Sequence, residues 1–386
     1  MTPHLARRTA DIQPFHVMEL LRRARELEAL GRDIIHMEVG EPDFPTPLPM
    51  IEAATRFLAT GDVHYTPALG LSALREAIAR FYHDRFGATV APERIVVTPG
   101  ASGALMLALA ATTDPGDEWL LPDPGYPSNR HLVRSFEGVS RSLPVHAATR
   151  FQPTAEQVAT AWTPRTRGLV VASPSNPTGT LLDAAELAAL REAVLTRGGT
   201  LIVDEIYQGL TYGVDASTVA GAMDDVFVVN SFSKYFGMTG WRLGWLVAPQ
   251  AYVRELEKLA QHFFISPSSP AQHAALAAFA PSTIEILEAR RHEFAARRDV
   301  LLPALRELGF VVSAEPQGAF YIYADVSGLA DDSEALARRL IEEAGVAATP
   351  GLDFGDNQPR RHLRIAYTTR TERLLEAVER MARMRA

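Results

Sequence analysis

One loop of this 386-residue chain gathers groups that can bind a phosphorylated aldehyde covalently. Ser231 and Ser233 precede Lys234, and Arg242 follows it by eight residues. A lysine amine forms an imine with an aldehyde, and two hydroxyls with a guanidinium can bind a phosphate through charge-assisted hydrogen bonds, each worth about 1.5–3 kcal/mol. Partial burial beside cations also lowers the pKa of a lysine and keeps its amine nucleophilic. These residue types favour a covalent site over a solvated basic loop.

Polar residues also follow two other apolar runs. Asn176 lies in a Ser-Asn-Pro-Thr-Gly turn after residues 168–173, and Asp204 and Tyr207 follow the run 200–203. Because the carboxyl ends of parallel strands meet at one edge of a sheet, we expect these side chains to lie near each other. An amide can donate hydrogen bonds, and a carboxylate can pair with a cationic group. Taken alone, Asn176 is also typical of a plain turn and Tyr207 of a core residue.

Small residues at 100–104 separate an expected strand from a helix that we expect to begin near Leu105. Backbone N–H groups at the start of a helix bind anions, so Ala101 and Ser102 are candidates for contacting a phosphate. Close packing of a small-residue turn is the alternative interpretation.

Arg364 alternates with apolar residues in the segment 362–367, which predicts a strand with this side chain on one face. A guanidinium presented in this way matches the two oxygens of a carboxylate. The carboxylate could belong to a ligand or to a neighbouring side chain.

The pattern of elements predicts an α/β fold with a mostly parallel sheet, since short β-branched runs alternate with Ala-rich amphipathic stretches. A capping box at Asp183 and Glu186 and a Gly198–Gly199 stop bound one helix, expected at 183–197. Further helices are expected at 15–30 and 283–308. We expect strands at 94–98, 118–121, 168–173, 200–204, 226–230, 242–247, 320–324 and 362–366.

The domain organisation follows from a change of pattern after residue 279, where a long charge-rich helical segment begins. The N-terminal segment does not look able to fold alone and is expected to pack with the C-terminal part. We expect residues 1–46 to form an arm and part of a small domain, 47–280 a large cofactor-binding domain, and 281–386 the rest of the small domain.

Composition excludes several classes of function. The net charge of −8 offers no basic field for nucleic acid. No apolar stretch reaches about 20 residues and no secretion signal is recognisable, so we expect a soluble, cytoplasmic protein with no membrane partner. There are no cysteines, and the 11 histidines show no metal-binding spacing, so no metal is assigned.

These motifs, in their order from Phe15 to Arg370, resemble the class I/II aminotransferases of fold type I, which are similar to aspartate aminotransferase. The resemblance implies a large domain with a mostly parallel sheet, a smaller α/β domain, and pyridoxal 5′-phosphate bound to Lys234 as a Schiff base. It implies that Asn176 and Tyr207 donate to the 3′ oxygen of the cofactor and that Asp204 pairs with its ring nitrogen. Two further contacts with the cofactor are implied: Tyr126 stacks on its ring, and its phosphate is bound by Ala101, Ser102, Ser231, Ser233 and Arg242. For the substrate, the resemblance implies that Gly40 lies in a loop over it and that Arg364 binds its α-carboxylate.

The resemblance also implies a homodimer with shared active sites, because Tyr65 matches a tyrosine that reaches the cofactor phosphate of the partner subunit. The implied reaction moves an amino group from an L-amino acid to a 2-oxo acid, with Lys234 as the general acid and base. We expect a neutral or hydrophobic side chain on the donor, since residues 262–267 and Phe15, His16 and Val17 are largely apolar.

Four other functions are alternatives to this one. An aspartate- or glutamate-directed aminotransferase and a pyridoxal-phosphate lyase of the same fold would keep nearly all of these residues. A cofactor-binding transcription regulator would need a DNA-binding module, for which there is no room before Phe15. A scaffold without catalysis is disfavoured because Lys234, Asp204, Asn176 and Arg364 are all present.

Overall fold

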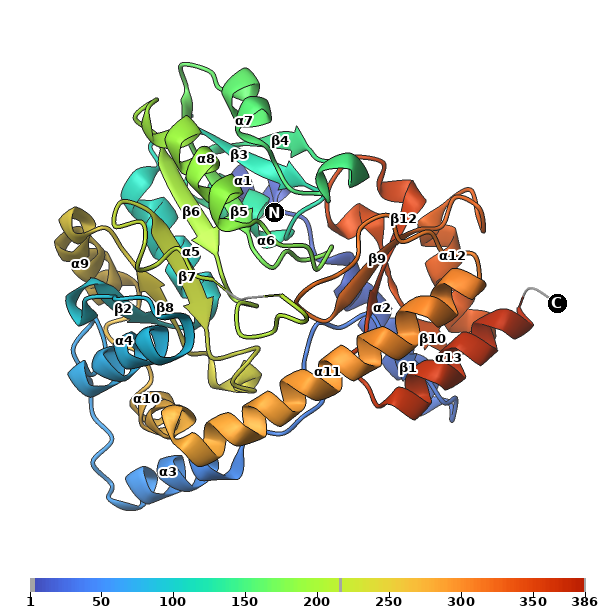
Figure 1. Ribbon diagram of the computed structural model, residues 1–386, viewed down its shortest axis with the longest axis horizontal. Coiled ribbons are helices and arrows are strands. Elements are labelled where there is room, and N and C mark those ends of the chain that lie inside the picture. The colour runs from blue at the N-terminus through green and yellow to red at the C-terminus, as the bar shows by residue number, and fades with distance from the viewer. Residues whose placement is uncertain (1–3, 215–216, 385–386) are drawn as a thin grey trace.

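The computed structural model describes residues 4–214 and 217–384, and its largest element is a seven-stranded sheet (Figure 1). The sheet confirms the predicted α/β class, since β3 to β7 run parallel and only β8 is antiparallel to both of its neighbours. In spatial order the strands are β2 (Ile95–Thr98), β8 (Gly244–Val247), β7 (Phe227–Ser231), β6 (Thr200–Asp204), β5 (Thr166–Ala172), β3 (Glu118–Asp123) and β4 (Val139–Pro144).

Six of these strands lie within two residues of the predicted bounds, whereas β4 was not predicted. Its sequence, Val-Ser-Arg-Ser-Leu-Pro, is polar because β4 is an edge strand with most of its side chains at least partly exposed. A strand of this kind lacks the continuous apolar run by which buried parallel strands are recognised.

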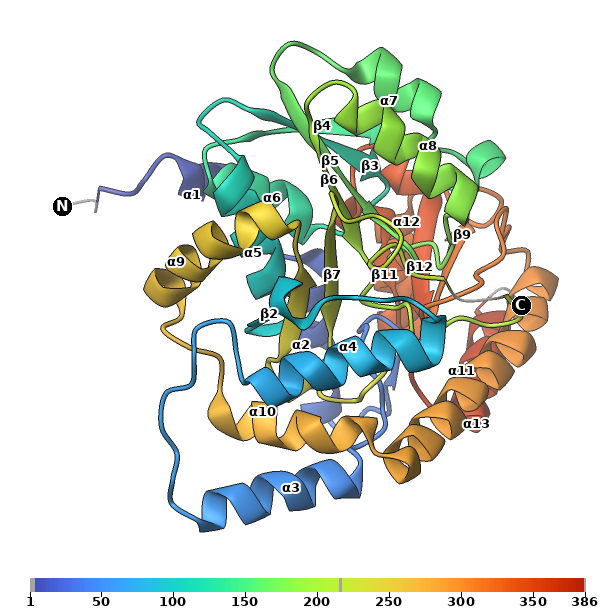
Figure 2. The same cartoon turned by 60° about the vertical axis from the view of Figure 1, so that its left-hand side comes forward.

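Helices cover both faces of the sheet, and the alternation of side chains along each strand decides which face they bury. Ile202 and Val229 point to the face covered by α5 (Gly100–Thr112), α6 (Ser128–Ser135) and α9 (Val253–Phe263). Val203 and Val228 point to the opposite face, under α4 (Ser72–Phe86), α7 (Ala155–Ala161), α8 (Ala184–Leu195) and α10 (Ser269–Leu276). Figure 2 shows α5, α6 and α9 to the left of these strands and α8 to the right.

The prediction that the helix after β2 begins near Leu105 was wrong, because α5 begins at Gly100. Small residues make this early start possible. A Cβ at Gly100 would lie 2.5 Å from a guanidinium nitrogen of Arg242, and one at Gly244 would lie 2.7 Å from the Gly100 backbone. The first turn of α5 is therefore packed against the Lys234 loop, where larger residues would not fit.

A second group of strands combines the two ends of the chain. β9 (Tyr321–Asp325) and β11 (Thr349–Pro350) pair with the central β12 (His362–Ala366), and β1 (Ile35–His36) pairs in parallel with β10 (Val346–Ala347). Around them lie α2 (His16–Ala29), α12 (Ser333–Arg339) and α13 (Thr371–Arg383). The N-terminal segment thus packs with the C-terminal part, as expected.

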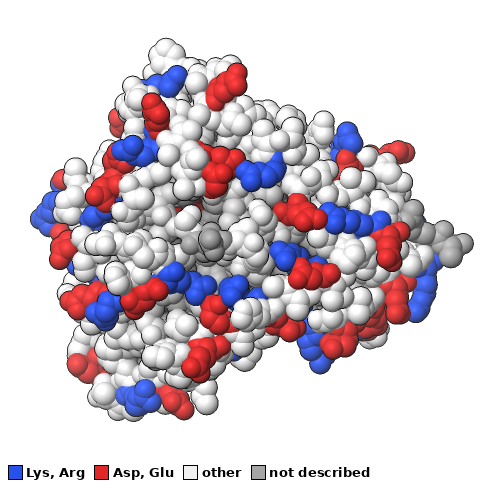
Figure 3. All heavy atoms as spheres, in the orientation of Figure 1, with Lys and Arg blue, Asp and Glu red and all other residues white. Residues whose placement is uncertain are grey.

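The long helix α11 (Pro281–Glu307) joins the two groups of strands, running from beside α10 to α13 (Figure 1). Two further helices complete the chain, α1 (Arg8–Asp11) beside α6 and α3 (Leu48–Ala59) beside α10. Acidic and basic side chains are interspersed over the face shown in Figure 3. No helix among residues 4–214 and 217–384 has the length and apolar content needed to cross a membrane.

Candidate active site

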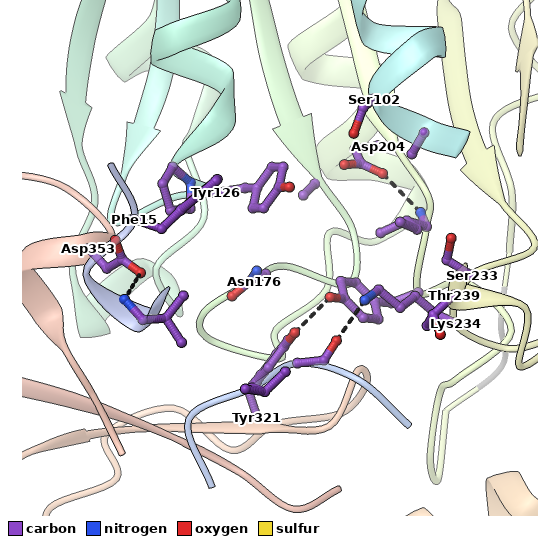
Figure 4. Close-up of a pocket in the computed structure, with 18 of the residues that line it drawn as sticks. Phe15, Ser102, Tyr126, Asn176, Asp204, Ser233, Lys234, Thr239, Tyr321 and Asp353 are labelled. Carbon is purple, nitrogen blue, oxygen red and sulfur yellow. Dashed lines mark hydrogen bonds between the residues drawn. The ribbon is translucent and has the colours of Figure 1, made fainter. Parts of the chain in front are cut away.

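A cavity of about 310 Å³ opens where the carboxyl ends of β5, β6 and β7 face α2 and β12. Figure 4 shows Lys234, Asp204, Asn176 and Tyr126 around it. Most of the residues predicted from the sequence line this cavity. Those that do are Gly40, Ala101, Ser102, Tyr126, Asn176, Asp204, Tyr207, Ser233, Lys234, Arg242 and Arg364.

Lys234 is positioned by the turn that follows β7, and its amine is held in place before any ligand arrives. Its Nζ donates a hydrogen bond of 2.7 Å to the carbonyl oxygen of Gly40. The pKa of this amine is lowered to about 8, mainly by burial and to a lesser extent by Arg364 and Arg242, against the opposing effects of Glu41 and Asp204. A substantial fraction of Lys234 is therefore neutral near physiological pH and able to attack an aldehyde.

The amino-terminal end of α5 and the Lys234 loop together form a site for an anion. Arg242 donates to the carbonyl oxygen of Thr239 at 2.9 Å and approaches the Ser233 hydroxyl at 3.4 Å. Ala101 and Ser102 lie in the first turn of α5, where backbone N–H groups lack partners within the helix. This arrangement of N–H, hydroxyl and guanidinium donors matches a phosphate.

Ser231 lies behind this anion site and does not line the cavity. Its hydroxyl donates to the carbonyl oxygen of Leu243, accepts from the Ser233 N–H and lies 2.9 Å from the Ser233 hydroxyl. We therefore read Ser231 as a residue that orients Ser233 rather than one that contacts a ligand directly.

Asp204 ends β6 as a buried carboxylate. The N–H of Ile206 donates to it at 3.0 Å, yet burial still raises the pKa of Asp204 to about 6, against the lowering effect of this bond and of Lys234. A cationic ring nitrogen placed beside it would add a donor and a positive charge, and both would favour the ionised carboxylate.

Arg364 crosses from β12 to the cavity and is fixed by three elements. Its Nη1 donates to Asn176 Oδ1 at 3.0 Å and its Nη2 to the carbonyl oxygen of Glu38 at 2.5 Å. The guanidinium also lies 4.4 Å from the ring centroid of Tyr321 and 4.8 Å from that of Phe354. Its Nε is buried and has no hydrogen-bond partner among residues 4–214 and 217–384, so a bound carboxylate can satisfy this donor.

Besides Ser231, three parts of the prediction are not brought into this cavity. Tyr65 is 80% exposed, on the loop between α3 and α4. Residues 262–267, expected as a pocket wall, line no part of it, and Phe263 and Ile265 are exposed. Of the N-terminal residues, Phe15 and Val17 do line the cavity, whereas His16 faces a separate groove beside α12.

Sequence reasoning also missed residues that the fold brings to the cavity, most notably Tyr321, Asp353 and Thr239. Thr239 could have been predicted, because its hydroxyl lies in the same loop as Lys234. Tyr321 and Asp353 stand among apolar residues in Phe-Tyr-Ile-Tyr and Gly-Leu-Asp-Phe-Gly, and neither pattern indicates a site.

The residues present match the requirements of pyridoxal phosphate. The Gly100–Arg242 approach, which leaves no room for a Cβ, keeps a guanidinium at the anion site. The unpartnered Nε of Arg364 lies at a second position suited to a carboxylate. The same cavity is lined by the low-pKa amine of Lys234, the buried carboxylate of Asp204 and the ring of Tyr126. These are the groups that such a cofactor needs.

Comparison with known proteins agrees with this geometry. A sequence model of the family described as aminotransferase class I and II matches residues 32–381. The valine–pyruvate aminotransferase of Mycobacterium tuberculosis is 39% identical over 383 residues, which cover 99% of this chain and 98% of the relative. The aspartate/prephenate aminotransferase of Thermus thermophilus is 37% identical over 383 residues, covering 98% of each chain.

Solved structures show the same similarity. A crystal structure of an aminotransferase from Mycobacterium tuberculosis has a TM-score of 0.95 at 38% identity and covers 99% of both chains. The aspartate aminotransferase of Thermus thermophilus with maleate has a TM-score of 0.93 at 37% identity, covering 99% of this chain and 100% of that one.

Proposed function

The chain belongs to the class I and II aminotransferases, which use pyridoxal phosphate, and on that premise we propose that its amino donor is an L-amino acid with a neutral or hydrophobic side chain. The proposal rests on the cavity wall opposite Lys234, which is apolar. Phe15, Val17, Met18 and Leu21 line it from α2 and the residue before it. Among the described residues, the cations that line the cavity are Lys234, Arg242 and Arg364.

These three cations already have proposed tasks, so none of the described cations that line the cavity remains for a second carboxylate. Arg242, with Ser233 and the start of α5, is assigned to the cofactor phosphate. Arg364 is assigned to the α-carboxylate of the substrate. A distal carboxylate would therefore lie unpaired against apolar side chains, which is costly.

The remaining site residues are assigned to the cofactor ring. We propose that Tyr126 stacks on it, that Asn176 and Tyr207 donate to its 3′ oxygen, and that Asp204 faces its nitrogen. When bound, pyridoxal phosphate supplies an electron sink for charge that develops at the substrate's α carbon. Asp204 strengthens that sink because a buried carboxylate favours a protonated ring nitrogen.

Lys234 is proposed to move the proton at the substrate's α carbon. Once the substrate amine has replaced Lys234 on the cofactor, the free Nζ of Lys234 accepts the proton from the substrate's α carbon. The same amine later donates a proton back to the substrate and cofactor. A neutral amine is required, and the low pKa of Lys234, about 8, favours it. Arg364, held by Asn176 and the Glu38 carbonyl, orients the α carbon for the transfer.

We also propose a homodimer in which Tyr65 contacts the partner's cofactor phosphate. Tyr65 does not line the cavity of its own chain, and the loop and helix beside it expose Leu48, Ile51, Leu58 and Val63. Exposed apolar side chains gathered in this way are typical of an interface. The chain is proposed to divide into 1–46 and 281–386, which share strands, and 47–280, which contains the seven-stranded sheet.

The donor can be identified by single turnover of the purified holoenzyme. Single amino acids are added, and the loss of the visible cofactor band and its return with a 2-oxo acid are followed. We expect valine, leucine or phenylalanine to react faster than aspartate by about tenfold or more, because an unpaired carboxylate is poorly accommodated. Faster conversion by aspartate or glutamate would overturn the donor proposal and indicate a cation from the partner subunit. A band that reacts without forming the aminated cofactor would indicate lyase chemistry.

A further inference from the structure

The apolar wall of the cavity depends on how α2 begins. Phe15 precedes the helix and provides no side-chain cap for its first N–H groups. That task falls to Asp353, 337 residues away, whose carboxylate accepts from the His16 N–H at 3.0 Å and from the Val17 N–H at 3.4 Å. A carboxylate at a helix N-terminus satisfies unpaired N–H groups and interacts favourably with the helix dipole. Figure 4 shows Asp353 beside Phe15, across the cavity from Lys234.

Asp353 is itself attached to the large sheet. It is only 2% exposed, and its backbone carbonyl accepts from Arg130 of α6 at 3.0 Å. The next residue, Phe354, accepts at its carbonyl from the N–H of Gly125 at 2.9 Å. The Asp123 carboxylate then binds the N–H groups of Asp356 and Asn357 at 3.0 and 3.2 Å.

These contacts attach the segment 353–357 to the loop that carries Tyr126 and Pro127. The same segment, through the Asp353 side chain, determines where α2 starts. The Asp353 carboxylate therefore links the start of the α2 wall directly to the proposed cofactor ring site. Val17, Met18 and Leu21 lie within the first two turns after it, so a shift of the N-terminus would move all three.

We propose that Asp353 is a positioning residue that sets the depth of the side-chain subsite and thereby the preference for long over short apolar donors. This inference rests on the proposed function of the same cavity. It assigns Asp353 no contact with the reacting atoms. Its effect is transmitted by the position of the α2 wall, which touches a long substrate side chain and barely meets the methyl group of alanine.

The far end of α2 provides a matched control. Arg23 forms a bidentate pair with Glu342, at 2.6 and 2.9 Å, and neither residue lines the cavity. A loss of this pair weakens an anchor of the same helix without changing its N-terminus. A role of Asp353 in general stability and a role in specificity can therefore be separated.

The test compares wild-type, Asp353→Ala and Glu342→Gln holoenzymes by steady-state kcat/KM for leucine and alanine. In Asp353→Ala, leucine is expected to fall more than alanine, so that their ratio drops about fivefold, the scale of a lost N-cap. Glu342→Gln is expected to keep the wild-type ratio. An unchanged ratio in Asp353→Ala, or an equal drop in Glu342→Gln, would overturn the proposal.

A second variant approaches the contact from the other side. His16→Pro removes the N–H that Asp353 accepts, and proline is tolerated at the first position of a helix. It leaves the carboxylate in place, so it keeps the test valid if Asp353→Ala does not fold. The same drop in the leucine-to-alanine ratio is expected, and a wild-type ratio would contradict the proposal. The donor proposal is judged separately, from the wild-type preference between leucine and aspartate.

Discussion

The phenolic oxygens of Tyr207 and Tyr321 lie 2.9 Å apart in the wall of the cavity, and the ring of the same Tyr321 lies against the guanidinium of Arg364. Both tyrosines are buried. For Tyr207 to donate to the 3′ oxygen of the cofactor, its own oxygen must accept the proton of Tyr321. Tyr321 would then influence the cofactor through its hydroxyl and the substrate through its ring.

Tyr321→Phe is expected to raise the pH midpoint at which the visible cofactor band of the holoenzyme titrates. A hydrogen bond to the deprotonated 3′ oxygen lowers this midpoint, and Tyr207 donates less strongly without Tyr321 behind it. The shift should be smaller than that of Tyr207→Phe, for which about 0.5–1 pH unit is expected from the loss of one hydrogen bond. Tyr321→Leu, which also removes the ring beside Arg364, should in addition weaken carboxylate binding. A wild-type midpoint in Tyr321→Phe would rule out the hydroxyl relay.

Arg364→Lys is expected to lower kcat/KM for the amino donor by about 10- to 100-fold, mainly through KM, because an ammonium cannot form the paired bonds of a guanidinium. The cofactor band should be retained, since Arg364 is assigned to the substrate. Steady-state kinetics and absorbance measure the two effects. Arg361→Lys is the control: Arg361 pairs with Asp325 at the molecular surface, and its replacement should leave both unchanged. Loss of the band with unchanged KM would assign Arg364 to the cofactor.

Apoenzyme carrying Lys234→Met is expected to be more stable than the wild-type apoenzyme at pH 7, by a margin that shrinks as the pH rises. Burial lowers the pKa of Lys234 from 10.5 to about 8. Between these values the unfolded chain binds more protons than the folded one, so the cost of burying the charged amine is complete below about pH 8 and is relieved toward pH 10.5. Urea unfolding at several pH values measures the margin.

Lys258 is the control for this comparison, because the chain has two lysines and Lys258 is half exposed. The difference in the free energy of unfolding between Lys258→Met and the wild-type apoenzyme should not vary over this pH range. A pH-independent margin for Lys234→Met would show that its amine is not buried as a charged group in the apoenzyme.

Mixing two inactive variants should restore activity if active sites are shared between subunits. Tyr65→Ala removes the proposed contact with the partner's phosphate, and Lys234→Arg removes the amine. A mixed dimer has one site with both residues intact, so random reassociation should yield about a quarter of the wild-type activity per subunit. Turnover before and after reassociation, with size-exclusion chromatography, measures this outcome. No recovery in a mixture that forms dimers would contradict the role of Tyr65.

Much of the site could be predicted because its residues stand at the ends of buried strands. Asn176, Asp204 and Lys234 follow β5, β6 and β7, and parallel strands place their carboxyl ends at one edge whatever the loops do. The predicted fold class, the cofactor and the aminotransferase activity are confirmed by the family match and the related structures. The roles of the individual site residues stay predictions.

Other features depend on where distant segments come to lie. Residues 262–267, predicted to form a pocket wall, do not line the cavity of their own chain, because apolar composition does not distinguish a pocket wall from a surface. The start of α5 was misjudged because glycine and alanine are used there for close packing with Arg242, which is about 140 residues away in the chain.

The sequence by itself predicted the chemistry, namely an amine, an anion site and an arginine for a carboxylate, because these depend on residue types within short motifs. The tertiary structure alone decided what surrounds that chemistry. Asp353 caps α2 and Tyr321 joins Tyr207 to Arg364 only because the two ends of the chain pair through β1 and β10 and fold onto the large sheet. A hydrogen bond depends on distances of a few tenths of an ångström between side chains, and no local pattern specifies such a distance across hundreds of residues.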